Sequence, residues 1–315
     1  MIEVKNLTKR FGPILAVDGI SFEVEAGEVV GFLGPNGAGK TTTIRILTCY
    51  HPATGGAASI GGFDVFKDSL EVRRRVGYLP ESTPLYGEMR VREYLNFRGK
   101  LRGMLPADRA KAIRRVVEQC WLEDFIGRPI GQLSKGMRQR VGLADAIMHE
   151  PEVLILDEPT IGLDPAQIRE TRNLIKDLGQ HHTILLSSHI LHEVEQTCSR
   201  TIIIAEGRIV ASGSPQELRD RFSAQGRVVA EMKGPRDEVE RGVRSLAGVK
   251  AVEVSPMNGW TRALIEPKPD TDIREDVYRL SNDKGWSLRE IRREGATLED
   301  FFIQVTARQH DRAGR

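Results

Sequence analysis

The sequence of 315 residues has no hydrophobic run long enough to cross a membrane. Its longest apolar runs, such as 153–156 and 202–205, have the length of single strands, whereas a membrane helix needs roughly 18 or more apolar residues. No signal peptide is expected either, because Glu3 and Lys5 interrupt any apolar segment at the amino terminus. We therefore expect a protein that is located in the cytoplasm and does not itself span a membrane.

Cysteine is scarce, and neither charge predominates. The three cysteines, Cys49, Cys120 and Cys198, form neither a metal-binding spacing nor a disulfide framework, which favours a reducing compartment and buried spectator thiols. Lys and Arg number 46 against 44 Asp and Glu, so the formal net charge is only +2. This balance gives no global basic surface, and no nucleic-acid partner is expected.

Glycine, in contrast, is concentrated in one stretch that has a clear chemical use. Residues 34–41 read Gly-Pro-Asn-Gly-Ala-Gly-Lys-Thr, which is the spacing of a phosphate-binding loop. Glycines let backbone N–H groups turn toward a phosphate, and the following helix directs its positive end to the same place. Lys40 is expected to neutralise phosphate and Thr41 to bind Mg²⁺. The predicted nucleotide contacts are Gly34, Pro35, Asn36, Gly37, Ala38, Gly39, Lys40, Thr41 and Thr42.

Two further apolar strands end in residues whose side chains could bind a metal, polarise water or contact a phosphate. Residues 153–156 are apolar on both faces, as in the middle of a parallel sheet, and Asp157 and Glu158 follow at the end where such sheets bind ligands. Adjacent strand residues point to opposite sides, so one carboxylate can support Mg²⁺ while the other polarises a water molecule. The alternative is that Asp157 and Glu158 simply form an acidic turn at the end of the strand and have no role in the chemistry. Residues 183–188 form a similar strand, and His189 after it is a candidate to contact a γ-phosphate or a purely structural residue.

Two other candidates are weaker when taken alone. Ser134 is suited to cap a helix that runs to about residue 148, and Gly136 lies close by, so this helix start could bind an anion. Most Ser-capped helices bind nothing, however. Phe11 stands beside a Gly-Pro turn, where it is either a ring that stacks on adenine or a core aromatic.

The segment after residue 221 has a different pattern. Strands are expected near 228–232, 249–254, 262–265 and 287–293, with helices over 235–246 and 273–284. This alternation predicts a small α+β domain with a ferredoxin-like arrangement. A further helix is expected to begin after Thr297 and to contain Phe301, Phe302 and Val305, and residues 309–315 are expected to form a flexible tail.

These motifs in this order resemble the ATP-binding subunit of an ABC transporter. Residues 34–41 resemble its Walker A loop, and 154–158 its Walker B strand with the following glutamate. Residues 133–137 resemble the signature motif, and 162–164 the D-loop. The resemblance implies that His189 is the switch histidine and that Phe11 stacks on adenine. It covers about residues 1–220.

Two positions differ from the family pattern. The signature reads LSKGM in place of LSGGQ, which keeps Ser134 and Gly136, the two residues that touch the γ-phosphate in the family, and replaces its glutamine with Met137. The glutamine that usually follows the strand 76–79 is replaced by Glu81, a carboxylate that could still bind Mg²⁺. Both variants resemble the exporter branch that includes drug-resistance, sodium-efflux and gliding-motility types.

The resemblance implies an α/β fold: a phosphate-loop ATPase core with a small antiparallel β subdomain and a helical subdomain. Residues 1–221 would form this ATP-binding domain and 222–308 an accessory domain. The implied function is ATP hydrolysis that powers export by a separate membrane permease, with ATP and Mg²⁺ held between two copies of the chain at the inner face of the membrane. The alternatives are an ABC ATPase that acts on ribosomes or DNA, and a regulator that does not hydrolyse ATP.

Overall fold

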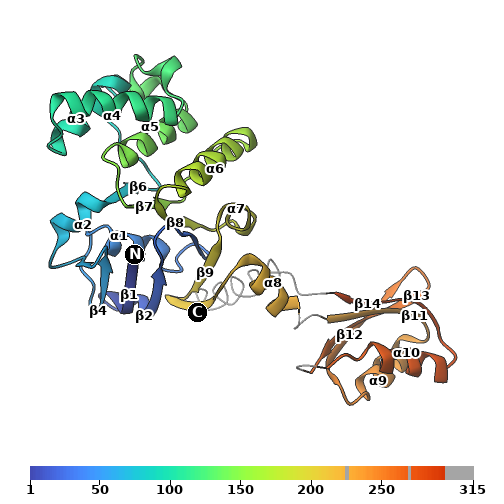
Figure 1. The fold of residues 1–315 in the computed structure, drawn as a ribbon. Helices are drawn as coiled ribbons and strands as arrows, with labels where there is room; N and C mark the ends of the chain where they lie inside the picture. Colours follow the sequence, from blue (N-terminus) through green and yellow to red (C-terminus); the bar gives the residue numbers. More distant parts are fainter. Residues whose placement is uncertain (224–226, 269–270, 295–315) are drawn as a thin grey trace. The chain divides into compact units, whose positions relative to one another are not determined.

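The computed structural model describes residues 1–223, 227–268 and 271–294, and the chain divides into two compact units between Pro215 and Gln216 (Figure 1). The described residues form two sheets in the first unit and one in the second, and each unit has its own hydrophobic core. None of the helices in these described ranges is long and apolar enough to cross a bilayer.

A six-stranded sheet forms the centre of the first unit, in the order β10-β9-β3-β8-β7-β6. The pairs from β9 to β6 are parallel, and β10 is antiparallel to β9. Strands β7 and β8 are buried along their whole length, as expected for runs that are apolar on both faces. The strand bounds are β3 (Val29–Leu33), β6 (Val76–Leu79), β7 (Val153–Asp157), β8 (Thr183–Ser188), β9 (Arg200–Ala205) and β10 (Arg208–Gly213).

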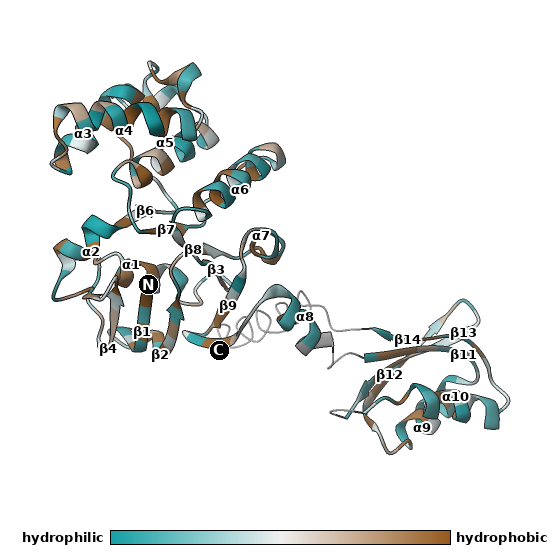
Figure 2. Cartoon of the chain, viewed as in Figure 1, coloured by the Kyte–Doolittle hydropathy of each residue, from teal (hydrophilic) through white to brown (hydrophobic). Residues whose placement is uncertain are grey.

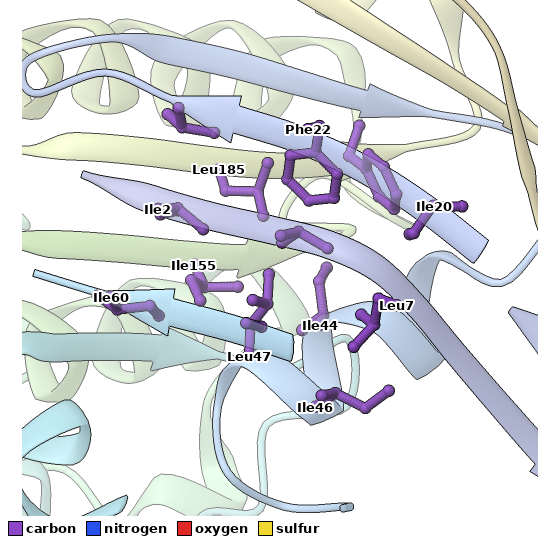
Figure 3. Packing of buried hydrophobic residues seen from close by; sticks show 14 of the residues in the cluster. Ile2, Leu7, Ile20, Phe22, Ile44, Ile46, Leu47, Ile60, Ile155 and Leu185 are labelled. Atoms are coloured by element: carbon purple, nitrogen blue, oxygen red, sulfur yellow. The ribbon is translucent and has the colours of Figure 1, made fainter. Parts of the chain in front are cut away.

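A second, antiparallel sheet packs in the same core, in the order β2-β1-β4-β5. Its strands are β1 (Ile2–Phe11), β2 (Ile14–Val24), β4 (Gly55–Ile60) and β5 (Phe63–Asp64). Helix α1 (Lys40–Leu47) contributes Ile44 and Leu47 to this core, where they lie between strands of both sheets (Figure 3). Each such buried side chain contributes about 1.5–3 kcal/mol. The packing of α1 therefore fixes the position of the glycine loop at its amino end.

Helices form the rest of the first unit. Helix α5 begins directly after its N-cap Ser134, whose Oγ accepts a hydrogen bond from Met137 N at 3.2 Å, as predicted. Helix α6 is amphipathic, with hydrophobic and hydrophilic residues on different faces (Figure 2). The helix bounds are α2 (Ser69–Arg75), α3 (Val91–Leu101), α4 (Pro106–Gln119), α5 (Lys135–Ile147), α6 (Pro165–Gly179) and α7 (Leu191–Thr197). Helix α8 (Pro215–Ser223) begins at the division, and all but its first residue belong to the second unit.

After α8, the second unit has the element order β-α-β-β-α-β and the antiparallel strand order β12-β13-β11-β14. This is the topology of a ferredoxin-like sheet, which confirms the predicted arrangement. Val239 of α9 and Val277 of α10 belong to the same buried core cluster as Ala263 and Ile265 of β13. The element bounds are β11 (Arg227–Lys233), α9 (Arg236–Arg244), β12 (Val249–Met257), β13 (Trp260–Pro267), α10 (Arg274–Asp283) and β14 (Ser287–Glu294).

The predicted α/β core, the antiparallel sheet, the helical segment and the carboxyl-terminal α+β unit are thus all present. The predicted last helix with Phe301, Phe302 and Val305, and the tail 309–315, lie outside the described residues.

A half-buried ion pair links the start of β9 to the turn before β3. Arg200 Nε lies 2.6 Å from Glu28 Oε1, and Arg200 Nη2 lies 2.9 Å from Glu28 Oε2 and 2.7 Å from the carbonyl oxygen of Glu23. The hydrogen bond from Arg200 holds the pKa of Glu28 below its ordinary value. Because the folded-state pKa is lowered, this stabilisation is present above the ordinary carboxyl pKa and is lost as the pH falls through the folded-state value.

We predict that Arg200→Ala lowers the protection of β3 and β9 amides against hydrogen exchange at neutral pH by about 1 kcal/mol. The difference from wild type should shrink as the pH falls through the folded-state pKa of Glu28. Arg208→Ala is the matched control, because Arg208 pairs with Asp18 but is largely exposed. An equal loss in both variants, or a loss that does not depend on pH, would contradict this assignment.

Candidate active site

The glycine-rich loop connects the end of β3 at Leu33 to the start of α1 at Lys40. Two of its glycines are required by close backbone contacts. A Cβ on Gly34 would overlap the carbonyl oxygen of Ile204, and a Cβ on Gly39 would lie 2.5 Å from that of Ala16. Gly39 also has φ +105°, which side-chain-bearing residues rarely adopt. The loop therefore packs on its scaffold only because these positions lack side chains.

Lys40 is buried at the first turn of α1, with 5% of its side chain exposed. Its Nζ donates hydrogen bonds to the carbonyl oxygens of Gly34 at 2.7 Å and Pro35 at 3.2 Å, and lies 3.4 Å from Glu158 Oε1. Burial lowers the pKa of Lys40, and the Glu158 carboxylate partly opposes this effect. The ammonium group thus lies within the loop and faces the carboxylate that follows β7.

Glu158 lies between two basic residues. Its Oε2 is 2.8 Å from His189 Nδ1, at the end of β8, while its Oε1 faces Lys40. Glu158 has φ +50°, an uncommon backbone conformation for a residue other than glycine. Its backbone N–H donates to Ser187 Oγ at 3.0 Å and lies 3.2 Å from the carbonyl oxygen of the same residue. The strained backbone is therefore held by β8, and the carboxylate is fixed from both sides.

Asp157 presents one carboxylate oxygen that has no hydrogen-bond partner within the described chain. Its Oδ1 accepts from Ser187 Oγ at 2.5 Å and from Thr41 Oγ1 at 3.5 Å, whereas its buried Oδ2 accepts none. Burial raises the pKa of Asp157, and the hydrogen bonds from Ser187 and Thr41 oppose this shift. A free carboxylate oxygen beside a threonine hydroxyl fits the oxygen ligands that Mg²⁺ takes in phosphate-loop enzymes.

No group of three or more His, Cys, Asp or Glu side chains able to hold a metal occurs in residues 1–223, 227–268 and 271–294. This is compatible with Mg²⁺, which takes most of its ligands from water and substrate phosphates and needs only one or two ligands from the protein. Glu81 is exposed after β6. Burial has the largest effect on the pKa of Lys40 and on that of Asp157, and the charge of Glu81 makes a small contribution to each. Glu81 thus lies within electrostatic reach of the site, and the structure gives it no contact with Thr41 or Asp157.

Three other predicted site residues do not contact this cluster. Phe11, 43% exposed at the end of β1, makes an edge contact with His51 and lies 4.9 Å from Lys9 Nζ. Within the described part of the chain, no hydrogen bond or ion pair joins Ser134 or Gly136 to the glycine loop. Ser134 is exposed at the tip of α5.

Ser187 is a site residue that the sequence reasoning missed. Its hydroxyl donates to Asp157 and accepts from the backbone of Glu158, so it links the two carboxylate residues. The available signal was a hydroxyl near the carboxyl end of a buried strand, because Asp157 and Ser187 are paired in the parallel β7–β8 register. The sequence alone does not give that register.

Comparison with known proteins assigns this arrangement to a family. Residues 17–161 match the family model described as ABC transporter. The chain is 37% identical over 313 residues to the Nod factor export ATP-binding protein I of Burkholderia lata, which covers 98% of this chain and 97% of that protein. This chain belongs to the ABC transporter ATP-binding proteins.

Two further similarities are informative. The linearmycin resistance ATP-binding protein LnrL of Bacillus subtilis is 34% identical over 309 residues, covering 98% of this chain and 99% of that protein. A dimeric ATP-binding cassette in a post-hydrolysis state, bound to ADP and phosphate, has a TM-score of 0.62 and 25% identity, covering 68% of this chain and 98% of the other. The chain is thus the ATPase of an ABC transporter, as the motifs predicted.

We predict that Gly39→Ala destabilises the nucleotide-free ABC ATPase by about 2 kcal/mol more than Gly37→Ala, because crowding adds roughly 1–3 kcal/mol. Gly37 is the matched control: its φ is +79°, yet a Cβ there would meet no atom within 4 Å. Both variants bear left-handed strain, and only Gly39→Ala also presses on the Ala16 carbonyl. Hydrogen exchange of α1 amides measures the difference. Equal destabilisation would show that the contact does not define the loop.

Proposed function

We propose that this chain powers an ABC exporter by closing on a second copy of itself around ATP and Mg²⁺ and by hydrolysing the ATP. The proposal rests on one observation: Lys40, Asp157, Glu158 and His189 converge at the carboxyl ends of β7 and β8, beside the glycine loop. This is the edge of a parallel sheet where ligands bind.

The proposed chemistry assigns each group a task. The N–H groups of residues 34–41 and the start of α1 bind the phosphates, with Gly34, Pro35, Asn36, Gly37, Ala38, Gly39 and Thr42 forming the loop around them. Lys40 Nζ exchanges its bonds to the Gly34 and Pro35 carbonyls for phosphate oxygens. Glu158 accepts a proton from the attacking water, and His189 holds Glu158 Oε2 in place and faces the γ-phosphate.

Thr41 and Asp157 would hold Mg²⁺. Bound there, the cation would neutralise charge on the β- and γ-phosphates. The unpartnered Asp157 Oδ2 supports this assignment, because a buried carboxylate oxygen without a donor is unfavourable unless a cation is close. We include Glu81 as a further candidate ligand, since it is within electrostatic reach of Asp157.

A second copy completes the proposed site. Ser134 and Gly136 would contact the γ-phosphate bound by the other copy, and Phe11 would stack on the adenine. The dimeric cassette bound to ADP and phosphate supports this arrangement. The separation of Ser134 from the loop within one chain is what a site shared between two chains requires.

The exporter assignment comes from relatives that are named for Nod factor export and linearmycin resistance. A separate membrane permease would carry the substrate. The ATPase would bind this permease at the cytoplasmic face of the membrane. Residues 1–221 would supply ATP hydrolysis, with 222–308 as an accessory domain. The two alternatives, a ribosome- or DNA-acting ATPase and a non-hydrolysing regulator, are not favoured by these relatives or by the intact pair of Glu158 and His189.

We predict that Glu158→Gln lowers ATP turnover by about 10²–10⁴-fold, the range for loss of a general base. ATP binding should persist, because Lys40 and the loop are unchanged, and the ATP-bound dimer should accumulate. Phosphate release and sedimentation velocity with ATP measure the two effects.

Glu118→Gln on α4 is the matched control, because Glu118 is exposed and α4 lies in the helical segment, apart from β7 (Figure 1). It should keep wild-type turnover. Near wild-type phosphate release by a folded Glu158→Gln protein would remove Glu158 from the mechanism.

A further inference from the structure

The signature motif of this chain carries a lysine, Lys135, where the family pattern LSGGQ has glycine. Neither the phosphate chemistry nor the cap of α5 uses this side chain. The structure shows where it goes: a Cβ on Gly162 would overlap Lys135 Nζ and lie 3.3 Å from its Cε and 3.5 Å from its Cδ. Lys135 therefore extends across Gly162, in the loop that precedes α6.

The same two segments make a second contact, in which the glycine belongs to α5 and the long side chain belongs to α6. A Cβ on Gly136 of α5 would lie 2.6 Å from Oε1 of Gln167, in the first turn of α6. Each segment thus offers one glycine and one long side chain, and each long side chain lies over the glycine of the other segment. A Cβ on either glycine would force the facing side chain to shift from its present position.

The loop under Lys135 is firmly held. Asp164 caps α6, and its Oδ1 accepts hydrogen bonds from Ala166 N at 3.0 Å and Gln167 N at 2.9 Å. Gly162 and Gln167 therefore flank one capped helix start, and Lys135 and Gly136 belong to another, which Ser134 caps. Displacement of one helix start would break contacts with the other.

We propose that Lys135 is a positioning residue that couples the signature turn of α5 to the loop before α6 within one chain. The two surfaces would then close on the partner's nucleotide as one body. This inference rests on the proposed function, because it assumes that Ser134 meets ATP held by a second copy. Lys135 itself is assigned no contact with phosphate.

A double-mutant cycle tests the coupling. The variants are Lys135→Ala, Gly162→Ala and both together, all made in the Glu158→Gln chain, with ATP-dependent dimer formation followed by sedimentation. Each single change should weaken the dimer by about 5- to 30-fold, and the double variant should be barely weaker than either, because contacting residues are not additive. ATP binding by the monomer should be unchanged in all three.

Gly103→Ala controls for backbone strain, because Gly103 has φ +73°, close to the +67° of Gly162, and a Cβ there would meet nothing within 4 Å. It should leave the dimer unaffected. Lys135→Met, which keeps a long unbranched side chain without the charge, should retain most of the dimer affinity. A Lys135→Met protein as weak as Lys135→Ala would show that charge, not packing, matters, and would overturn the proposal.

The outcomes separate this inference from the proposed function. If the Glu158→Gln chain fails to dimerise with ATP, the shared-site function is wrong. If it dimerises and the effects of Lys135→Ala and Gly162→Ala are additive, the function stands and the coupling through Lys135 is rejected.

Discussion

The site depends on the burial of opposite charges at one end of a parallel sheet. Lys40 and Glu158 are both about 95% buried and lie 3.4 Å apart, so each compensates the charge of the other. Removing one partner from a buried pair leaves an uncompensated charge, which destabilises a protein by roughly 3–5 kcal/mol. In the proposed function, ATP enters this arrangement and its phosphate oxygens become the partners of the Lys40 ammonium. In the nucleotide-free chain, the charges of Lys40 and Glu158 therefore compensate each other until the phosphates of ATP become the new partners of Lys40.

The rest of the first unit keeps these groups in register. The parallel pairing of β7 with β8 aligns Asp157 with Ser187, and the core around Ile44 and Leu47 holds α1 against the same sheet. The glycine loop then bridges β3 and α1 where any Cβ on Gly34 or Gly39 would collide with backbone. Strand order, helix packing and glycine content thus act together, and no single one of them would position Lys40 opposite Glu158.

Much of this could be predicted from the sequence, because the information is local. The loop spacing predicted the glycine turn between β3 and α1, the apolar run before Asp157 predicted a buried interior strand, and Ser134 predicted the start of α5. Contacts between distant segments could not be predicted. The role of Ser187 depends on the β7–β8 register, and the contact of Lys135 with Gly162 depends on how α5 meets α6. The nucleotide and Mg²⁺ contacts of all the site residues, Phe11 and Ser134 included, belong to the proposed function, since they involve groups outside a single chain.

The central claim is that one ATP is bound by Lys40 of one chain and Ser134 of another. The most direct measurement mixes two inactive variants, Lys40→Ala and Ser134→Arg, and assays ATP hydrolysis by the mixture. A mixed dimer regains one complete site, with Lys40 from one chain and Ser134 from the other, so activity absent from each variant alone should return. No recovery, in a mixture where formation of the mixed dimer is verified, would contradict the account.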